Sequence, residues 1–191
     1  VLIRKKEYRF KDFIMLAHKN RISLSATGFY KTPKIHYDRK TGKGRPFYYY
    51  ANGAAVSEVV IDTLTGEYKV TQVDICHDVG SSINPALDIG QIEGGFIQGM
   101  GWLTSEELVW DNSGRLTTNN TASYKIPAIG DTPIRFNVEL LPKSPNMEAT
   151  LFHSKAVGEP PLILALPIWS VLRDAISSVS NYRISPRLDT P

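Results

Sequence analysis

Two neighbouring runs of β-branched residues constrain the fold of this chain more than any other feature. Residues 54–62 and 68–75 are both rich in valine, isoleucine and threonine at a spacing of two. This period is typical of β-strands that bury one face. The residues between them, 63–67, include a glycine that can adopt a positive φ. The pattern therefore predicts an antiparallel hairpin at the centre of a sheet.

Helical periodicity appears on both sides of this hairpin. Apolar residues recur at helical spacing in residues 8–19, 92–108 and 163–178. Ser82 or Asn84 followed by Pro85 predicts a helix start, with either polar side chain as the N-cap.

The last helical segment contains Pro167, and proline is not tolerated in a helix interior. This helix should therefore begin near Leu166 or kink there.

Further strands are expected at residues 22–25, 134–141 and 149–152. Strands and helices do not alternate in a regular βαβ order, which favours an α+β fold over a doubly wound sheet. We expect mixed, mostly antiparallel strands with helices packed on them. No internal repeat or low-complexity linker is found, so residues 1–191 are expected to form one compact piece.

Composition excludes several function classes. The chain has 191 residues, 42% of them hydrophobic, and a formal net charge of +3. The total charge gives no argument for a nucleic-acid partner, and we expect no membrane span or signal peptide. A basic cluster near the start is expected to be a solvated face; it comprises Arg4, Lys5, Lys6, Arg9 and Lys11.

Cysteine and histidine usage argues against a metal site made by this chain. The single cysteine, Cys76, excludes an internal disulfide and an iron–sulfur cluster ligated by this chain alone. The four histidines show no metal-ligand spacing, and no nucleotide-binding glycine motif follows a strand. The aromatic run at residues 47–50 could stack on bases, but packing is the simpler interpretation.

Glycines interrupt the predicted helix at residues 92–108. Gly94, Gly95, Gly99 and Gly101 each cost roughly 0.5–1 kcal/mol relative to alanine. Gln91, Gly95, Gln98 and Gly99 fall roughly on one helical stripe. Periodicity alone leaves two explanations open: close helix packing, or a smooth surface with amides for a ligand.

A carboxylate occupies a restrained position near the end of the chain. Glu159 lies between Gly158 and the pair Pro160-Pro161, and an apolar run follows. Prolines are tolerated in the first turn of a helix, so Glu159 is held where a loop enters a helix. As a helix N-terminal residue it would be a partner of the helix dipole.

Two motifs carry a family resemblance. Residues 90–101, Gly-Gln-Ile-Glu-Gly-Gly-Phe-Ile-Gln-Gly-Met-Gly, and residues 155–162, Lys-Ala-Val-Gly-Glu-Pro-Pro-Leu, occur in the order used by the xanthine dehydrogenase/aldehyde oxidase family of molybdenum hydroxylases. Residues 78–85 and 123–127 also resemble that family. Within it, the chain is most similar to the C-terminal portion of the molybdenum-binding subunit of xanthine dehydrogenases.

The resemblance implies a molybdopterin-binding domain, with the metal held by the cofactor and not by side chains. By position, Glu159 matches the glutamate that acts as general base. Gln91 matches the glutamine that hydrogen-bonds the pterin, and its amide offers both donors and an acceptor. Val157 and Gly158 would meet the cofactor through their backbone groups, and Lys155 would belong to the same cofactor-binding loop.

The resemblance also implies partners. Iron–sulfur clusters and FAD would be carried by other parts of the enzyme, and the upstream part of the same subunit would complete the site. The substrate would be hypoxanthine or xanthine, with aldehydes or other heterocycles as the alternative, in a cytoplasmic and oligomeric enzyme. The isolated chain is expected to hold no molybdopterin and to be inactive. From other classes, a non-catalytic interaction module and a nucleic-acid-binding protein remain as alternatives.

Overall fold

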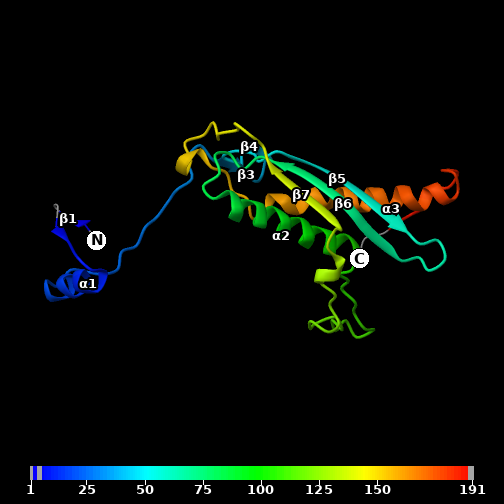
Figure 1. The fold of residues 1–191 in the computed structure, drawn as a ribbon, viewed down its shortest axis with the longest axis horizontal. Coiled ribbons are helices and arrows are strands. Elements are labelled where there is room, and N and C mark those ends of the chain that lie inside the picture. The colour runs from blue at the N-terminus through cyan, green and yellow to red at the C-terminus, as the bar shows by residue number, and fades with distance from the viewer. Residues whose placement is uncertain (1, 4–5, 189–191) are drawn as a thin grey trace. The chain divides into compact units, whose positions relative to one another are not determined.

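The computed structural model describes residues 2–3 and 6–188, and these form two compact units, residues 1–48 and 49–191 (Figure 1). The expectation of one compact piece was therefore wrong. Residues 22–35 contain no helix or strand and are almost entirely exposed, so no packed core joins this stretch to a regular element. Arg4 and Lys5 of the basic cluster lie outside the described residues.

The first unit contains short elements. β1 (Leu2–Ile3) pairs with β2 (Lys6–Glu7), and β3 (His36–Asp38) pairs with β4 (Lys43–Arg45). The predicted helix is present as α1 (Phe10–Lys19). Lys6, Arg9 and Lys11 are exposed, in agreement with a solvated face.

The predicted strand at residues 22–25 is absent. The Ser23 hydroxyl donates to the carbonyl of Ser25 and accepts from the Ser25 amide. Such local bonds give the backbone an alternative to pairing in a sheet.

The second unit is built on the predicted hairpin. β5 (Gly53–Ile61) runs antiparallel to β6 (Tyr68–His77), and β7 (Arg135–Leu140) joins β6 in parallel. The Asp62 carboxylate accepts from the Leu64 amide at 2.8 Å, and Gly66 has φ +79°, as the loop requires. The strand order is β5-β6-β7.

Each of the two long helices of the second unit has a proline in its first turn. α2 (Pro85–Thr104) is capped by Asn84, whose side chain accepts from the Leu87 amide, as predicted. It starts earlier than the apolar periodicity suggested and ends at Thr104 instead of residue 108, because the amides of Ser105 and Glu106 both turn back to the Gly101 carbonyl.

The final helix divides in two. A 3-10 helix, η3 (Pro160–Ala165), leads into α3 (Leu166–Val179), with Pro167 in the first turn of α3. Of the two alternatives for Pro167, the later helix start is correct.

Two further 3-10 turns are η1 (Ile129–Asp131) and η2 (Leu151–His153). The strand predicted at residues 149–152 was therefore wrong. Phe152 and His153 have φ of 50° and 58°, which no extended strand can accommodate.

The core lies on one face of the sheet. Val73 and Ile75 of β6 meet Ile92 and Phe96 of α2 and Ile168 of α3 in one cluster of buried residues. The opposite face is exposed in this chain, with Val56 69% and Val60 57% accessible. α2 and α3 thus cover a single side of the three-stranded sheet (Figure 1), which confirms the α+β class.

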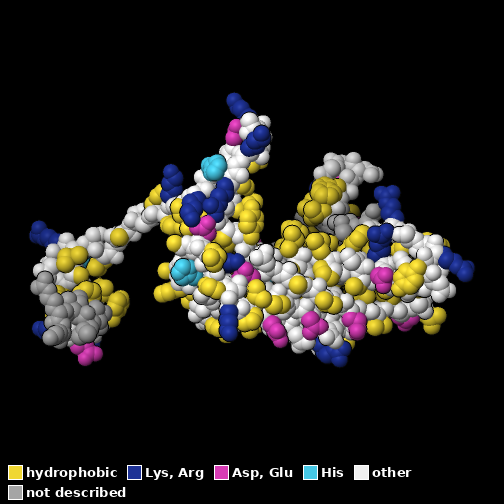
Figure 2. Space-filling view, turned by 90° about the horizontal axis from the view of Figure 1, so that it is seen from above, with side chains coloured by type: hydrophobic (Ala, Val, Ile, Leu, Met, Phe, Trp, Pro, Cys, Tyr) yellow, Lys and Arg dark blue, Asp and Glu magenta, His cyan; other side chains and the backbone are white. Residues whose placement is uncertain are grey.

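Hydrophobic side chains also remain exposed elsewhere. Figure 2 shows them at many places among charged groups on one face, and Trp102, Trp110 and Ile163 are each more than half accessible. Within the described residues, Pro160–Val179 has the length and composition of a membrane span, with a mean hydropathy of 1.5. The expectation that no apolar run reaches that length was wrong. In the structure this stretch is η3 followed by α3, and its buried residues pack in the core.

Candidate functional site

Three of the predicted site residues lie together at the surface. A Cβ built on Gly158 would be 3.3 Å from Oε1 of Gln91, so the glycine backbone and the glutamine amide are neighbours although 67 positions separate them in the sequence. Glu159 follows directly as the residue preceding η3, and its side chain makes no capping hydrogen bond. Gln91, Gly158 and Glu159 are all exposed.

Several hydrogen-bonding groups around Gln91 and Gly158 have no protein partner within the described residues. Within the described part of the chain, the side-chain amide of Gln91 and the backbone amides of Val157 and Gly158 have no hydrogen-bond partner. Backbone and side-chain amides that converge without partners are suited to the polar edge of a ligand. Val157 itself is buried in the core and holds the loop in place.

Gly95 and Gly99 of α2 allow close packing. A Cβ on Gly95 would lie 3.1 Å from Cβ of Pro161, and one on Gly99 would overlap the carbonyl of Leu162. Both glycines are buried, so they do not form the smooth ligand surface that was one of the two explanations left open by the periodicity. Close packing is the correct explanation for Gly95 and Gly99, and it lets η3 approach α2.

This packing fixes the position of Glu159 relative to Gln91, because both residues lie beside the contact between η3 and α2. Gln98 is exposed about two helical turns further along α2, and it makes no described contact with this cluster.

Lys155 is paired inside the protein. Its ammonium group donates to Oδ2 of Asp78 and, at 2.9 Å, to the carbonyl of Tyr50. The two charged side chains are only 10% and 3% accessible. Asp78 also accepts from the Gly80 amide at 2.9 Å. Burial raises the pKa of Asp78, but these hydrogen bonds outweigh it and hold that pKa below its ordinary value.

The backbone around Lys155 is held by the end of β6. The Lys155 amide donates to the carbonyl of Val79, and Gly80 forms an antiparallel bridge with Ser154. Gly80 has φ +66°, and a side chain there would lie 2.5 Å from the carbonyl of His153.

The phenol of Tyr49 accepts from the Ala156 amide at 2.9 Å. Sequence reasoning missed Asp78 and Tyr49. The available signals were the family resemblance of residues 78–85 for Asp78 and the aromatic run at residues 47–50 for Tyr49.

His77 occupies the last position of β6 and is 2% accessible. Neither ring nitrogen has a hydrogen-bond partner, and a Cβ on Gly53 would lie 2.6 Å from Nδ1. Burial lowers the pKa of His77; Asp78 opposes this effect and Lys155 adds to it. The imidazole is therefore kept neutral beside the ion pair.

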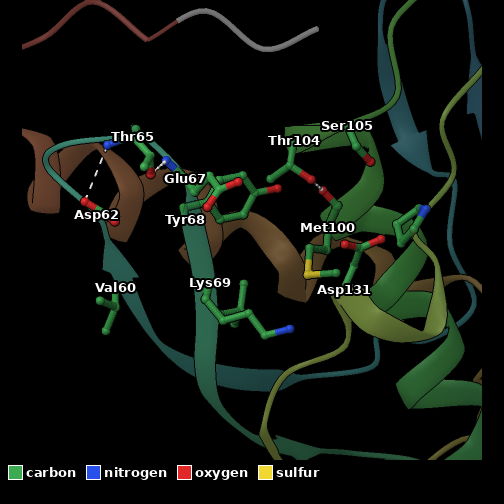
Figure 3. Close-up of a pocket in the computed structure, with 13 residues that line it drawn as sticks. Val60, Asp62, Thr65, Glu67, Tyr68, Lys69, Met100, Thr104, Ser105 and Asp131 are labelled. Carbon is green, nitrogen blue, oxygen red and sulfur yellow. Dashed lines mark hydrogen bonds between the residues drawn. The ribbon is translucent and has the colours of Figure 1, made fainter.

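A pocket lies away from this cluster. It has a volume of about 690 Å³ and is lined by the hairpin end of β5 and β6, the last turns of α2 and the turn near Asp131 (Figure 3). Met100 and Thr104 line it, roughly 14 Å and 20 Å along α2 from Gln91 at 1.5 Å per residue. None of the predicted site residues contributes to it. Within residues 2–3 and 6–188, no group of three or more His, Cys, Asp or Glu side chains is placed to hold a metal ion.

Comparison with known proteins identifies the family. Residues 1–133 match the molybdopterin cofactor-binding domain family. The chain belongs to this family. The expected resemblance to the molybdopterin-binding part of xanthine dehydrogenases is confirmed by relatives such as the xanthine dehydrogenase/oxidase of Gallus gallus, which is 50% identical over 185 residues. That match covers 95% of this chain and 14% of the relative, so the chain spans about one seventh of the length of such proteins.

Solved structures agree with the fold. Aldehyde oxidoreductase from Desulfovibrio gigas superposes with a TM-score of 0.63 at 26% identity, covering 93% of this chain and 18% of that one. Quinoline 2-oxidoreductase from Pseudomonas putida 86 gives a TM-score of 0.60 at 32% identity, covering 68% and 16%.

The residues present fit a molybdopterin. The family's cofactor has a polar heteroaromatic edge, and the structure provides an amide side chain and two backbone N–H groups without partners beside a glycine that leaves room for approach.

Proposed function

We propose that this chain is the C-terminal part of the molybdopterin-binding subunit of a xanthine dehydrogenase-type molybdenum hydroxylase, and that Glu159 is its general base. The observation that carries the proposal is the convergence of Gln91, Gly158 and Glu159 at one exposed point of the fold. These residues come from two motifs that lie far apart in the sequence. The packing of η3 on α2 brings them together, and the amides without partners beside them support a cofactor site.

When bound, molybdopterin supplies the two-electron redox chemistry. The Gln91 amide and the amides of Val157 and Gly158 would hold the pterin edge. The carboxylate of Glu159 accepts the proton released when water-derived oxygen is added to a ring carbon of hypoxanthine or xanthine. General-base catalysis of this type contributes typically 10²–10⁴-fold to a rate.

The remainder of the enzyme would complete the site. Exposed apolar side chains such as Val56, Trp102 and Ile163 are the kind of surface that another part of the protein covers. We propose that the upstream part of the same subunit covers them, and that iron–sulfur and FAD domains receive the electrons in a cytoplasmic, oligomeric enzyme. The isolated chain would then hold no cofactor.

Two alternatives are kept for the test. Aldehydes or another heterocycle are the alternative to the purine, since the two solved relatives are an aldehyde oxidoreductase and a quinoline 2-oxidoreductase. A non-catalytic packing module is supported by the use of Gly95 and Gly99 for close contacts.

The deciding experiment is Glu159→Gln in the full-length enzyme, assayed with xanthine, hypoxanthine and an aldehyde. We expect turnover to fall by about 10²–10⁴-fold, because glutamine cannot accept the proton, while the molybdenum content stays near that of the unmodified enzyme. Glu107→Gln, an exposed carboxylate elsewhere in the chain, is the matched control. Near-normal turnover of the Glu159→Gln variant would refute the role of Glu159 as general base. If the unmodified enzyme contained molybdenum but did not turn over xanthine, the substrate would be an aldehyde or another heterocycle.

A further inference from the structure

A buried ion pair lies directly behind the loop that ends in Glu159. Asp78 and Lys155 come from positions 77 residues apart, and their side chains are 3% and 10% accessible. Removing two charges from water is costly, and a buried pair is tolerated only when its geometry is good and the remaining donors and acceptors are satisfied. A buried ion pair without a function would cost more free energy than apolar side chains of similar volume.

Both charges are satisfied within the protein. Lys155 donates to Asp78 and to the carbonyl of Tyr50, and Asp78 also accepts from the Gly80 amide. The ammonium group is therefore bound to protein partners, and its side chain is only 10% accessible. In this arrangement Lys155 has little exposed charge to offer a cofactor.

The loop between two anchors is short. Lys155 is fixed by the ion pair at one end, and Pro161 and Leu162 are fixed by the glycines of α2 at the other. Between these anchors lie Ala156, whose amide is held by the Tyr49 phenol, the buried Val157, and then Gly158 and Glu159. Because both ends of the loop are held, the Glu159 backbone has few accessible conformations.

We infer that Asp78 and Lys155 are positioning residues: the pair fixes the loop of residues 155–159 so that Glu159 and the Gly158 amide face the cofactor, and Lys155 acts through this loop without touching the cofactor. The inference rests on the proposed function for its consequence in turnover. The restraint of the loop itself does not depend on that function.

The test uses the full-length protein with Lys155→Met, Asp78→Asn and the double variant. The exposed pair Asp111–Arg115, replaced together by asparagine and methionine, is the matched control because its loss leaves no buried charge. Three quantities are measured: amide hydrogen exchange of residues 156–162, molybdenum content, and kcat and KM for xanthine.

Each single variant is expected to raise amide exchange in residues 156–162 by about tenfold or more, since it leaves an uncompensated buried charge beside the loop. kcat should fall by about tenfold, with KM changed by less than about threefold and molybdenum retained, because a displaced base weakens the chemical step more than binding. The double variant should recover part of the exchange protection and part of kcat. The control pair should change none of these quantities.

Two results would overturn the inference. Loss of molybdenum in Lys155→Met with unchanged exchange in residues 156–162 would make Lys155 a direct cofactor contact. Unchanged exchange in all three variants would show that the pair restrains nothing. If a single variant does not fold, the double variant, which leaves no unpaired charge, carries the test. If the unmodified protein has no molybdenum and no turnover, the proposed function fails, and the exchange data still decide whether the pair positions the loop.

Discussion

Two segments pack against glycines of α2, and they differ in what they leave exposed. The loop at residues 155–162 meets Gly95 and Gly99, while residues 106–127 meet Gly101, where a Cβ would overlap Oε1 of Glu106 and lie 2.6 Å from Pro127. The contacts are of the same kind. Within the described residues, the first segment places the unpartnered Gly158 amide beside the unpartnered side-chain amide of Gln91.

At the second segment, the polar groups satisfy one another. The Tyr124 phenol donates to the buried carboxylate of Glu106, and this hydrogen bond raises the pKa of Tyr124. The Ser105 hydroxyl donates to the carbonyl of Lys125. The 690 Å³ pocket lies at this end, yet cavity size is a weaker guide to chemistry than unpaired groups held in fixed positions.

The largest effect is expected at Gly99. Alanine there would collide with the Leu162 carbonyl and lie 2.8 Å from Cβ of Ala165. The variant should destabilise α2 by about 1–3 kcal/mol, which exceeds the roughly 0.5–1 kcal/mol that alanine gains over glycine in a helix. It should also lower turnover, since Leu162 lies three residues after Glu159. Native-state hydrogen exchange of α2 and an activity assay of the full-length enzyme measure both effects.

Gly94 provides the control for this variant. No atom lies within 4 Å of a Cβ placed there, so Gly94→Ala should stabilise the helix by about 0.5–1 kcal/mol. If both alanine variants were stabilising, the close packing between α2 and η3 would not hold.

A smaller effect of a different kind is expected at Gly101. Alanine should weaken the contact with Glu106 and Pro127 by about 1–2 kcal/mol, seen as faster amide exchange in residues 101–106. Turnover should remain within about twofold of normal, because the second segment takes no part in the proposed chemistry. A large loss of activity with intact molybdenum would remove the distinction between the two segments.

The Gln91→Ala variant should lower cofactor binding without changing protein stability. Gln91 is exposed and has no hydrogen-bond partner among the described residues, so truncation should leave stability unchanged. Loss of a pterin hydrogen bond should weaken cofactor retention by about 1 kcal/mol, or roughly fivefold, measured as molybdenum lost during dialysis. Gln98→Ala, on the same helix and also exposed, should retain its metal. Equal loss in both variants would argue against a specific role for Gln91.

Acid should weaken the end of β6, where the first segment is anchored. The pKa of His77 is lowered in the folded protein, so below about pH 6.5 the unfolded chain takes up the proton first and stability falls as the pH decreases towards the folded pKa. The lowered pKa of Asp78 extends this loss to pH below about 3.8. Exchange of the β6 amides near His77, corrected for the intrinsic pH dependence, should rise between pH 7.5 and 5.5, and His77→Leu should reduce that rise.

Local signals in the sequence predicted much of the fold. The hairpin at residues 54–75 and the Asn84 cap of α2 follow from residue types that act within a few positions. The strand predicted at residues 149–152 failed because Phe152 and His153 are held at positive φ within a dense set of local hydrogen bonds. At the end of α3, Val179 is 67% exposed, so the apolar spacing there does not mark a buried face.

The sequence by itself determined the family, the α+β class and the residues of two motifs, because motif identity and hydrophobic periodicity are properties of short segments. Only the tertiary structure decided that Gln91 and Gly158 are neighbours, that Gly95 and Gly99 are packing contacts, and that Lys155 is paired with Asp78. Each of these contacts joins residues more than 60 positions apart. Their partners are set by how η3 packs on α2 and how the loop meets the end of β6, and no local pattern specifies either arrangement.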